Sequence, residues 1–206
     1  RLGVDASEEY LFMILLSPMR SYYNKNLKVK VETDFIRAAK GGTGAAKNGG
    51  NYGASLLPQR LAREAGFDQI IWLDAAERRY IEESGTMNLM VILDGVSLIT
   101  PPAGETVLEG ITRDSILRLA PSIGLEVNER RIKVTELIQW IETGRKVEVF
   151  GVGTAAVISP IESICYQGIY VYPNTQADSR MFELKALLQS IRIGTKADSF
   201  AWNHLV

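Results

Sequence analysis

Cysteine and histidine are nearly absent from the sequence. Cys165 is the one cysteine among 206 residues, so an internal disulfide is excluded and a reducing, cytoplasmic location is favoured. We expect this residue, in the apolar run "ESICYQG", to be a small core side chain. His204 is the one histidine, and no residue near it in the sequence suggests a metal site or a catalytic triad, so we expect it at the surface.

An excess of one charge and long hydrophobic runs are absent as well. The 23 basic and 24 acidic residues give a formal net charge of -1, which argues against nucleic-acid binding. The run "YLFMILL" over 10–16 is far shorter than the roughly 20 residues of a membrane-spanning helix. It predicts a buried strand instead. The sequence therefore indicates a globular protein with no membrane segment.

The remaining patterns predict strands and helices that do not strictly alternate. Apolar runs indicate strands at 28–33, 69–73, 87–93, 97–100, 125–132, 146–150, 155–158 and 168–172. Helical spacing indicates helices over about 54–66, 112–124, 135–143 and 177–192, and Pro58 is expected in the first turn of the first helix. Because several strands follow one another directly, we predict an α+β fold with a mixed or antiparallel sheet, in one domain over 1–206.

The stretch "GGTGAAKNGGNYG" (41–53) places glycines on both sides of Lys47. A phosphate-binding P-loop is excluded, because it needs glycine before the lysine and Ser or Thr after it, whereas Ala46 and Asn48 stand there. The residues alone leave a surface loop with an incidental lysine, or a ligand loop to which Tyr52 adds a hydrogen-bonding ring. A third role, a lysine that bonds to an aldehyde cofactor, requires an acid, phosphate donors and ring contacts elsewhere in the chain.

Five blocks of the sequence carry a resemblance to a known family: "GGTGAAKNGGNYGASLLPQ" (41–59), "GFDQIIWLD" (66–74), "IEESGTMNLMV" (81–91), "LEGITRDSILRLA" (108–120) and "FGVGTAAVISPI" (150–161). With these blocks in family order, the chain resembles the large domain of branched-chain amino acid aminotransferases, which are fold-type IV pyridoxal phosphate enzymes. The resemblance implies a barrel-like β structure surrounded by helices. It also implies amino transfer between Leu, Ile or Val and 2-oxoglutarate.

The same resemblance implies a role for each candidate residue around the cofactor ring. Lys47 is the catalytic lysine that bonds to pyridoxal 5'-phosphate and moves the substrate proton, and Tyr52 donates a hydrogen bond to the phenolic oxygen of the cofactor. Glu83 pairs with the pyridine nitrogen. Its neighbour Glu82 is the competing assignment, and alternation along a strand allows only one of the two to face the ring.

The other candidate residues are expected around the phosphate and the substrate. The cofactor-binding set is completed by Leu108, Ile111, Thr112 and Thr154, of which Leu108 packs against the ring and the others bind the phosphate. The substrate-contacting set is Tyr22, Thr86, Thr154 and Ala155, with Tyr23 as the alternative to Tyr22. No metal ligand is expected.

The family's small N-terminal domain, which supplies an arginine to the phosphate, matches no part of these 206 residues. We therefore expect the chain to be the large domain of a longer enzyme that forms a homodimer or higher homo-oligomer. Two alternatives stay open. One is another fold-type IV enzyme, a D-amino acid aminotransferase or an aminodeoxychorismate lyase. The other is a non-catalytic domain that keeps the fold.

Overall fold

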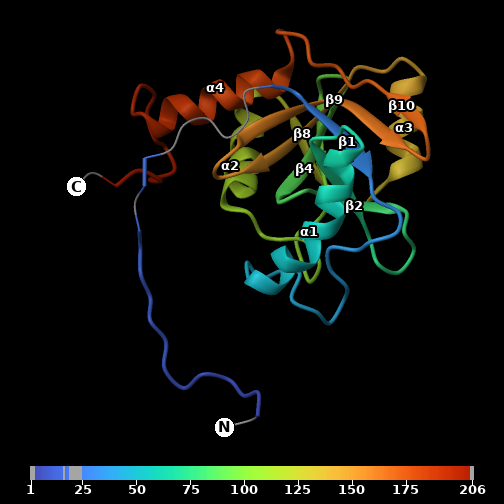
Figure 1. The fold of residues 1–206 in the computed structure, drawn as a ribbon. Coiled ribbons are helices and arrows are strands. Elements are labelled where there is room, and N and C mark those ends of the chain that lie inside the picture. Colours follow the sequence, from blue (N-terminus) through green and yellow to red (C-terminus); the bar gives the residue numbers. More distant parts are fainter. Residues whose placement is uncertain (1–2, 16, 19–24, 205–206) are drawn as a thin grey trace.

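The computed structural model describes residues 3–15, 17–18 and 25–204. Six strands close into a barrel in the order β4, β8, β9, β1, β2 and β3, and β3 pairs back to β4 (Figure 1). Their bounds are β1 Leu27–Val31, β2 Gln69–Leu73, β3 Tyr80–Ser84, β4 Met87–Leu93, β8 Val147–Gly153 and β9 Val157–Tyr166. Strand β1 runs parallel to β2 and β9, and the other barrel pairs are antiparallel. The predicted α+β fold with a mixed, barrel-like sheet is confirmed.

Four shorter strands extend the barrel, and helices surround it (Figure 1). Strands β5 Ser97–Thr100 and β6 Glu126–Glu129 continue the sheet beyond β4, β7 Ile132–Lys133 pairs with β3, and β10 Ile169–Val171 pairs with β9. The helices are α1 Gly49–Glu64, α2 Ile111–Leu119, α3 Val134–Glu142 and α4 Arg180–Arg192, and a 3-10 turn, Ala120–Ile123, follows α2. No helix among the described residues has the length and apolarity needed to cross a membrane.

Strand β4 explains why continuous apolar runs predicted strands well. Leu89, Val91 and Leu93 belong to the hydrophobic cluster inside the barrel, to which α3 adds Leu137. Met90 and Ile92 point the other way, into a second cluster formed with α2 and α4. Because successive side chains of a strand alternate between faces, a strand buried on both faces has to be apolar throughout.

Two expectations from the sequence are wrong. Residues 10–15 of the predicted strand 10–16 lie in no strand, and their side chains are 63–85% exposed. An apolar run forms a strand only where another strand offers hydrogen-bond partners, and within the described chain none pairs with it. Pro58 lies inside α1, because Asn48 caps the helix several residues earlier than expected by accepting a hydrogen bond from the Asn51 amide.

Helix α4 is fixed to the barrel by a carboxylate that is fully buried. Glu148 of β8 accepts hydrogen bonds from the backbone N–H groups of Arg180 (3.0 Å) and Met181 (2.9 Å), the first residues of the helix. Burial raises the pKa of the Glu148 carboxyl, and the two N–H donors oppose that rise. The Glu148 carboxylate therefore caps the N-terminus of α4, although it belongs to a strand far away in the sequence.

We predict that Glu148→Leu lowers the free energy of unfolding by about 2–4 kcal/mol, because two buried N–H groups lose their acceptor. Glu148→Gln should lose less, since its carbonyl still accepts one bond. Glu183→Leu makes the same chemical change at a half-exposed position of α4 and should cost at most about 1 kcal/mol. Urea unfolding measures all three. Equal losses at positions 148 and 183 would contradict this account of helix capping.

Candidate active site

Lys47 lies on the loop that leads into α1, and the first turn of that helix fixes the loop. The Asn51 side chain donates hydrogen bonds to the carbonyl oxygens of Thr43 and Ala46, both at 2.7 Å, and accepts one from the Thr43 hydroxyl at 2.7 Å. The loop also packs tightly at Gly44, where a Cβ would lie 2.8 Å from the backbone oxygen of Glu105. Gly44 therefore allows two loops to pack together, and a side chain at this position would separate them.

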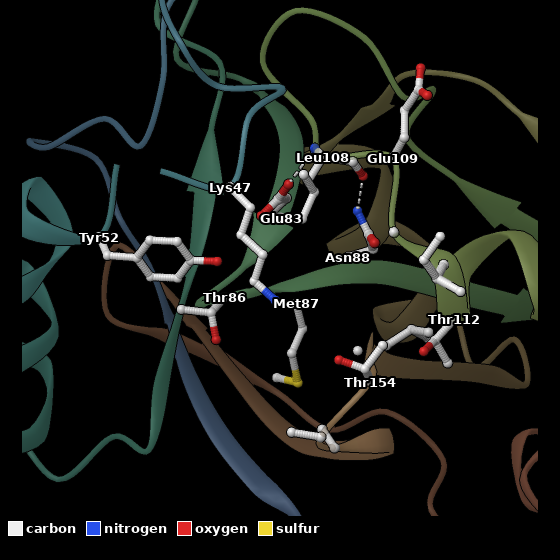
Figure 2. Close-up of a pocket in the computed structure, with 16 residues that line it drawn as sticks. Lys47, Tyr52, Glu83, Thr86, Met87, Asn88, Leu108, Glu109, Thr112 and Thr154 are labelled. Atoms are coloured by element: carbon white, nitrogen blue, oxygen red, sulfur yellow. Dashed lines mark hydrogen bonds between the residues drawn. The ribbon is translucent and has the colours of Figure 1, made fainter. Parts of the chain in front are cut away.

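Lys47 and Tyr52 point into a cavity of about 340 Å³ at the end of the barrel (Figure 2). Figure 2 shows the lysine amine and the tyrosine hydroxyl entering from one side, and Thr112 and Thr154 lying on the opposite side. The cavity therefore offers an amine and a hydroxyl on one side and two hydroxyls on the other, with Met87 on the strand between them.

The β3–β4 hairpin settles which glutamate faces this cavity. Glu83 lines it and is 3% exposed. Glu82 points to the opposite face of β3, where its Oε1 accepts a hydrogen bond from the Thr106 hydroxyl at 2.6 Å and where it lines a separate cavity. The expected alternation of the two carboxyls is confirmed, although β3 is missing from the strands that the sequence predicted. Two adjacent glutamates made this segment look like a solvent-exposed edge.

Burial dominates the electrostatics of Glu83. Removal from water raises the pKa of its carboxyl to about 7, against the opposing influence of the Arg37 guanidinium and of the Leu108 N–H, while the nearby Glu82 adds to the rise. The Arg37 Nη2 lies 3.2 Å from Glu83 Oε1. A carboxyl with a pKa near neutrality can hold or release a proton at physiological pH, which suits a group that shares a proton with a ligand.

The backbone of Leu108 joins the two strands of the hairpin. Its N–H donates to Glu83 Oε1 (2.8 Å), and its carbonyl accepts from the Asn88 side-chain amide (2.8 Å). Glu83 and Asn88 are direct partners in the β3–β4 ladder. A Cβ on Gly110 would lie 2.2 Å from Asn88 Oδ1, so a side chain there would displace the Asn88 amide from the Leu108 carbonyl.

The turn ends at the N-terminus of α2, which borders the same cavity. Gly110 is the N-cap and provides no side-chain acceptor, so the first N–H groups of the helix have no cap from that residue. Ile111 and Thr112 line the cavity, and Thr112 is 7% exposed. Across the cavity, Thr154 and Ala155 lie on the β8–β9 loop. Uncapped N–H groups with a hydroxyl beside them form a site suited to an anion.

The structure brings nine of the ten predicted site residues to this one cavity: Lys47, Tyr52, Glu83, Thr86, Leu108, Ile111, Thr112, Thr154 and Ala155. Tyr22, the tenth, lies outside the described residues, as does Tyr23. Sequence reasoning missed Arg37, Asn51 and Asn88, which hold the predicted residues in place. Asn88 lies within the block 81–91 that resembles the family, so that block could have indicated it. Arg37 lies outside all five blocks, and no sequence pattern marks it as a site residue.

Comparison with known proteins places this geometry in a family. The family model for class IV aminotransferases matches residues 3–164. The curated branched-chain-amino-acid aminotransferase 2 of Bacillus subtilis is 44% identical over 205 residues, which cover 98% of this chain and 56% of that protein. The chain thus spans little more than half the length of this relative.

Two solved structures share the fold. The branched-chain amino acid aminotransferase from Escherichia coli superposes with a TM-score of 0.72 at 33% identity, over 86% of this chain and 56% of that one. The T.th. branched-chain amino acid aminotransferase, complexed with N-(5'-phosphopyridoxyl)-L-glutamate, superposes with a TM-score of 0.71 at 29% identity, over 86% of this chain and 55% of that one. The chain belongs to the class IV aminotransferase family.

The ionisation of Glu83 makes a prediction about stability in the cofactor-free protein. Because the folded-state pKa of about 7 lies above the usual 4.5 of a glutamate, the folded state holds a proton that the unfolded chain releases. This contribution to stability is complete below pH 4.5 and is lost as the pH rises to about 7. Across this pH range, Glu83 should lower the free energy of unfolding of the wild type by roughly 3 kcal/mol, and Glu83→Gln should abolish that decrease.

The measurement is chemical unfolding at several pH values from 4 to 9, as the difference between wild type and variant. Glu162→Gln makes the same change at a half-buried position of β9 and serves as the control. A Glu83→Gln profile parallel to that of the wild type would show that Glu83 ionises normally in the folded protein.

Proposed function

We propose that the protein is a branched-chain amino acid aminotransferase, which moves an amino group between Leu, Ile or Val and 2-oxoglutarate with pyridoxal 5'-phosphate as cofactor. The observation that carries this proposal is the meeting of Lys47, Tyr52, Glu83 and the uncapped start of α2 in one cavity. The names of the relatives support the substrate class.

The donors around the cavity fit pyridoxal phosphate. Its three polar regions, a phosphate, a ring nitrogen and a phenolic oxygen beside an aldehyde, need an anion site, an acid and a donor near an amine. The first N–H groups of α2 with the buried Thr112 hydroxyl provide the anion site, and Glu83 provides the acid. Tyr52 and Lys47 provide the donor and the amine on the opposite side of the cavity (Figure 2).

The cofactor, when bound, withdraws electrons from the substrate α-carbon, and the residues of the chain provide the proton transfers and the binding. Lys47 would hold the cofactor covalently and then carry a proton as general base and acid at its Nζ. Glu83 would share a proton with the ring nitrogen and keep that nitrogen cationic. Tyr52 would donate a hydrogen bond to the phenolic oxygen and stabilise its negative charge.

The remaining cavity residues would orient the two ends of the bound molecules. Ile111 and Thr112 would bind the phosphate through the backbone at the start of α2, and Leu108 would pack against the ring. Thr154 would contribute to the phosphate site. The substrate carboxylate would be received by the amides of Thr154 and Ala155, with Thr86 beside the substrate. Tyr22, which lies outside the described residues, is proposed as a further substrate contact.

The partners of the whole protein are part of the same proposal. We propose a small N-terminal domain that adds an arginine to the phosphate site, and a homodimer or higher homo-oligomer, because the cavity has a side that the described residues leave open. The reducing cytoplasm that the single cysteine favours is the proposed location. These proposals concern the protein made from the complete native coding sequence.

We predict that Lys47→Ala lowers the rate of amino transfer from L-leucine to 2-oxoglutarate by about 10²–10⁴-fold or more. This range is the usual contribution of a positioned acid–base group. Lys40→Ala removes another exposed lysine of the same loop, outside the cavity, and should retain the wild-type rate. A coupled assay of the complete protein measures both rates.

A substrate panel decides among the alternatives. Activity with D-alanine and none with L-leucine would indicate a different fold-type IV enzyme. Binding of pyridoxal phosphate without turnover of any amino acid would indicate a non-catalytic domain. Either result, or full activity of Lys47→Ala, would reject the proposed function.

A further inference from the structure

The Arg37 side chain is 9% exposed and touches three parts of the structure at once. Its Nη2 lies 3.2 Å from Glu83 Oε1, donates to the Gly44 carbonyl at 3.0 Å, and donates to the Thr106 carbonyl. Gly44 belongs to the loop that carries Lys47, and Thr106 belongs to the loop that leads to Leu108 and α2. One guanidinium group therefore connects the lysine loop, the turn before α2 and the buried carboxyl.

These contacts meet where the two loops pack most tightly. A Cβ at Gly44 would lie 2.8 Å from both Glu105 O and Thr106 Cα, so the loops have no room for another side chain between them. All three contacts are made by one nitrogen, Nη2, whose two N–H groups donate to the carbonyls of the two loops while the guanidinium charge lies beside the Glu83 carboxyl. A lysine ammonium keeps the charge but presents its donors in a different geometry.

Among the described residues, Arg37 is the cation that forms an ion pair with Glu83. The other titratable groups near Glu83 are Glu82, which points to the opposite face of the strand, and Lys47, Tyr52 and Glu109, which line the same cavity. Glu82 opposes ionisation of Glu83, whereas the Arg37 charge and the Leu108 N–H favour it. A carboxylate this deeply buried needs a compensating charge at close range.

We propose that Arg37 is a positioning residue, which favours the charged form of the Glu83 carboxyl and holds the lysine loop against the turn before α2. The part of this inference that concerns the cofactor rests on the proposed function, because there Glu83 faces the ring nitrogen. The part that concerns Glu83 itself does not. Loss of the guanidinium charge favours the neutral acid, and a neutral acid cannot stabilise a protonated ring nitrogen.

The direct test is a carboxyl-carbon NMR titration of the cofactor-free protein, expressed from its complete coding sequence and labelled with ¹³C at the glutamate carboxyls. The Glu83 signal is assigned by its loss in Glu83→Gln. Arg37→Gln retains donors for the two carbonyls and removes the charge. We expect it to raise the pKa of Glu83 by about 1–3 units, the usual effect of an opposite charge at this distance. Arg37→Lys should keep the pKa near that of the wild type.

A matched control separates this effect from the general loss of a buried arginine. Arg180 resembles Arg37 in that its guanidinium donates to a carbonyl, Ile123, and to a carboxylate, Glu183, and in that its Nε is buried without a partner in the described chain. It lies at the start of α4, outside the cavity. Arg180→Gln should leave the Glu83 titration unchanged.

A second readout is the affinity for pyridoxal phosphate, followed by fluorescence at pH 7. Arg37→Gln should weaken binding about 10-fold or more, and Arg37→Lys should weaken it less. The inference is overturned if Arg37→Gln leaves the Glu83 titration unchanged, or if Arg180→Gln moves it equally. It is also overturned if Arg37→Lys raises the pKa, a result that stays available if Arg37→Gln does not fold.

The two proposals fail in different ways. If Arg37→Gln shifts the Glu83 titration but the wild-type protein binds no pyridoxal phosphate, the positioning role stands and the proposed function fails. If the wild-type protein transaminates L-leucine but the titration does not shift, the proposed function stands and the role of Arg37 fails.

Discussion

Burial of the Glu83 carboxyl at the end of the barrel is the constraint on which the rest of the site depends. A carboxyl that is 3% exposed needs partners, and these come from elements far apart in the sequence, namely the Arg37 guanidinium and the Leu108 N–H. Each partner belongs to a loop that also carries candidate binding residues. The same contacts that stabilise one buried acid therefore fix the loops around it.

The barrel makes this arrangement possible because β3 pairs back to β4. That pairing places Asn88 directly opposite Glu83, and the two side chains bind the N–H and the carbonyl of the same residue, Leu108. These two hydrogen bonds fix the turn before α2 to strands β3 and β4. The uncapped start of α2 therefore lies at the edge of the cavity. The buried acid and the uncapped helix start are consequently joined through one residue of backbone.

The sequence predicted elements better where burial alone determines the pattern. The strands at 69–73 and 87–93 were found with their bounds, because residues buried on both faces leave a continuous apolar run. The same reasoning failed at 10–15, since a pattern indicates a tendency to be buried but not a partner strand. The candidate site residues were assigned through family resemblance. Arg37 was missed because its contacts, with Gly44, Glu83 and Thr106, are set by tertiary structure and leave no local pattern.

Above all, we propose that this cavity binds pyridoxal phosphate through Lys47. Borohydride reduction of the complete protein after incubation with pyridoxal phosphate, followed by peptide mass spectrometry, tests that claim most directly. We predict a single phosphopyridoxyl group on Lys47, in the peptide that contains "GGTGAAKNGG". A protein that gains no such group, or that carries it on Lys40 or another surface lysine in place of Lys47, would contradict the account.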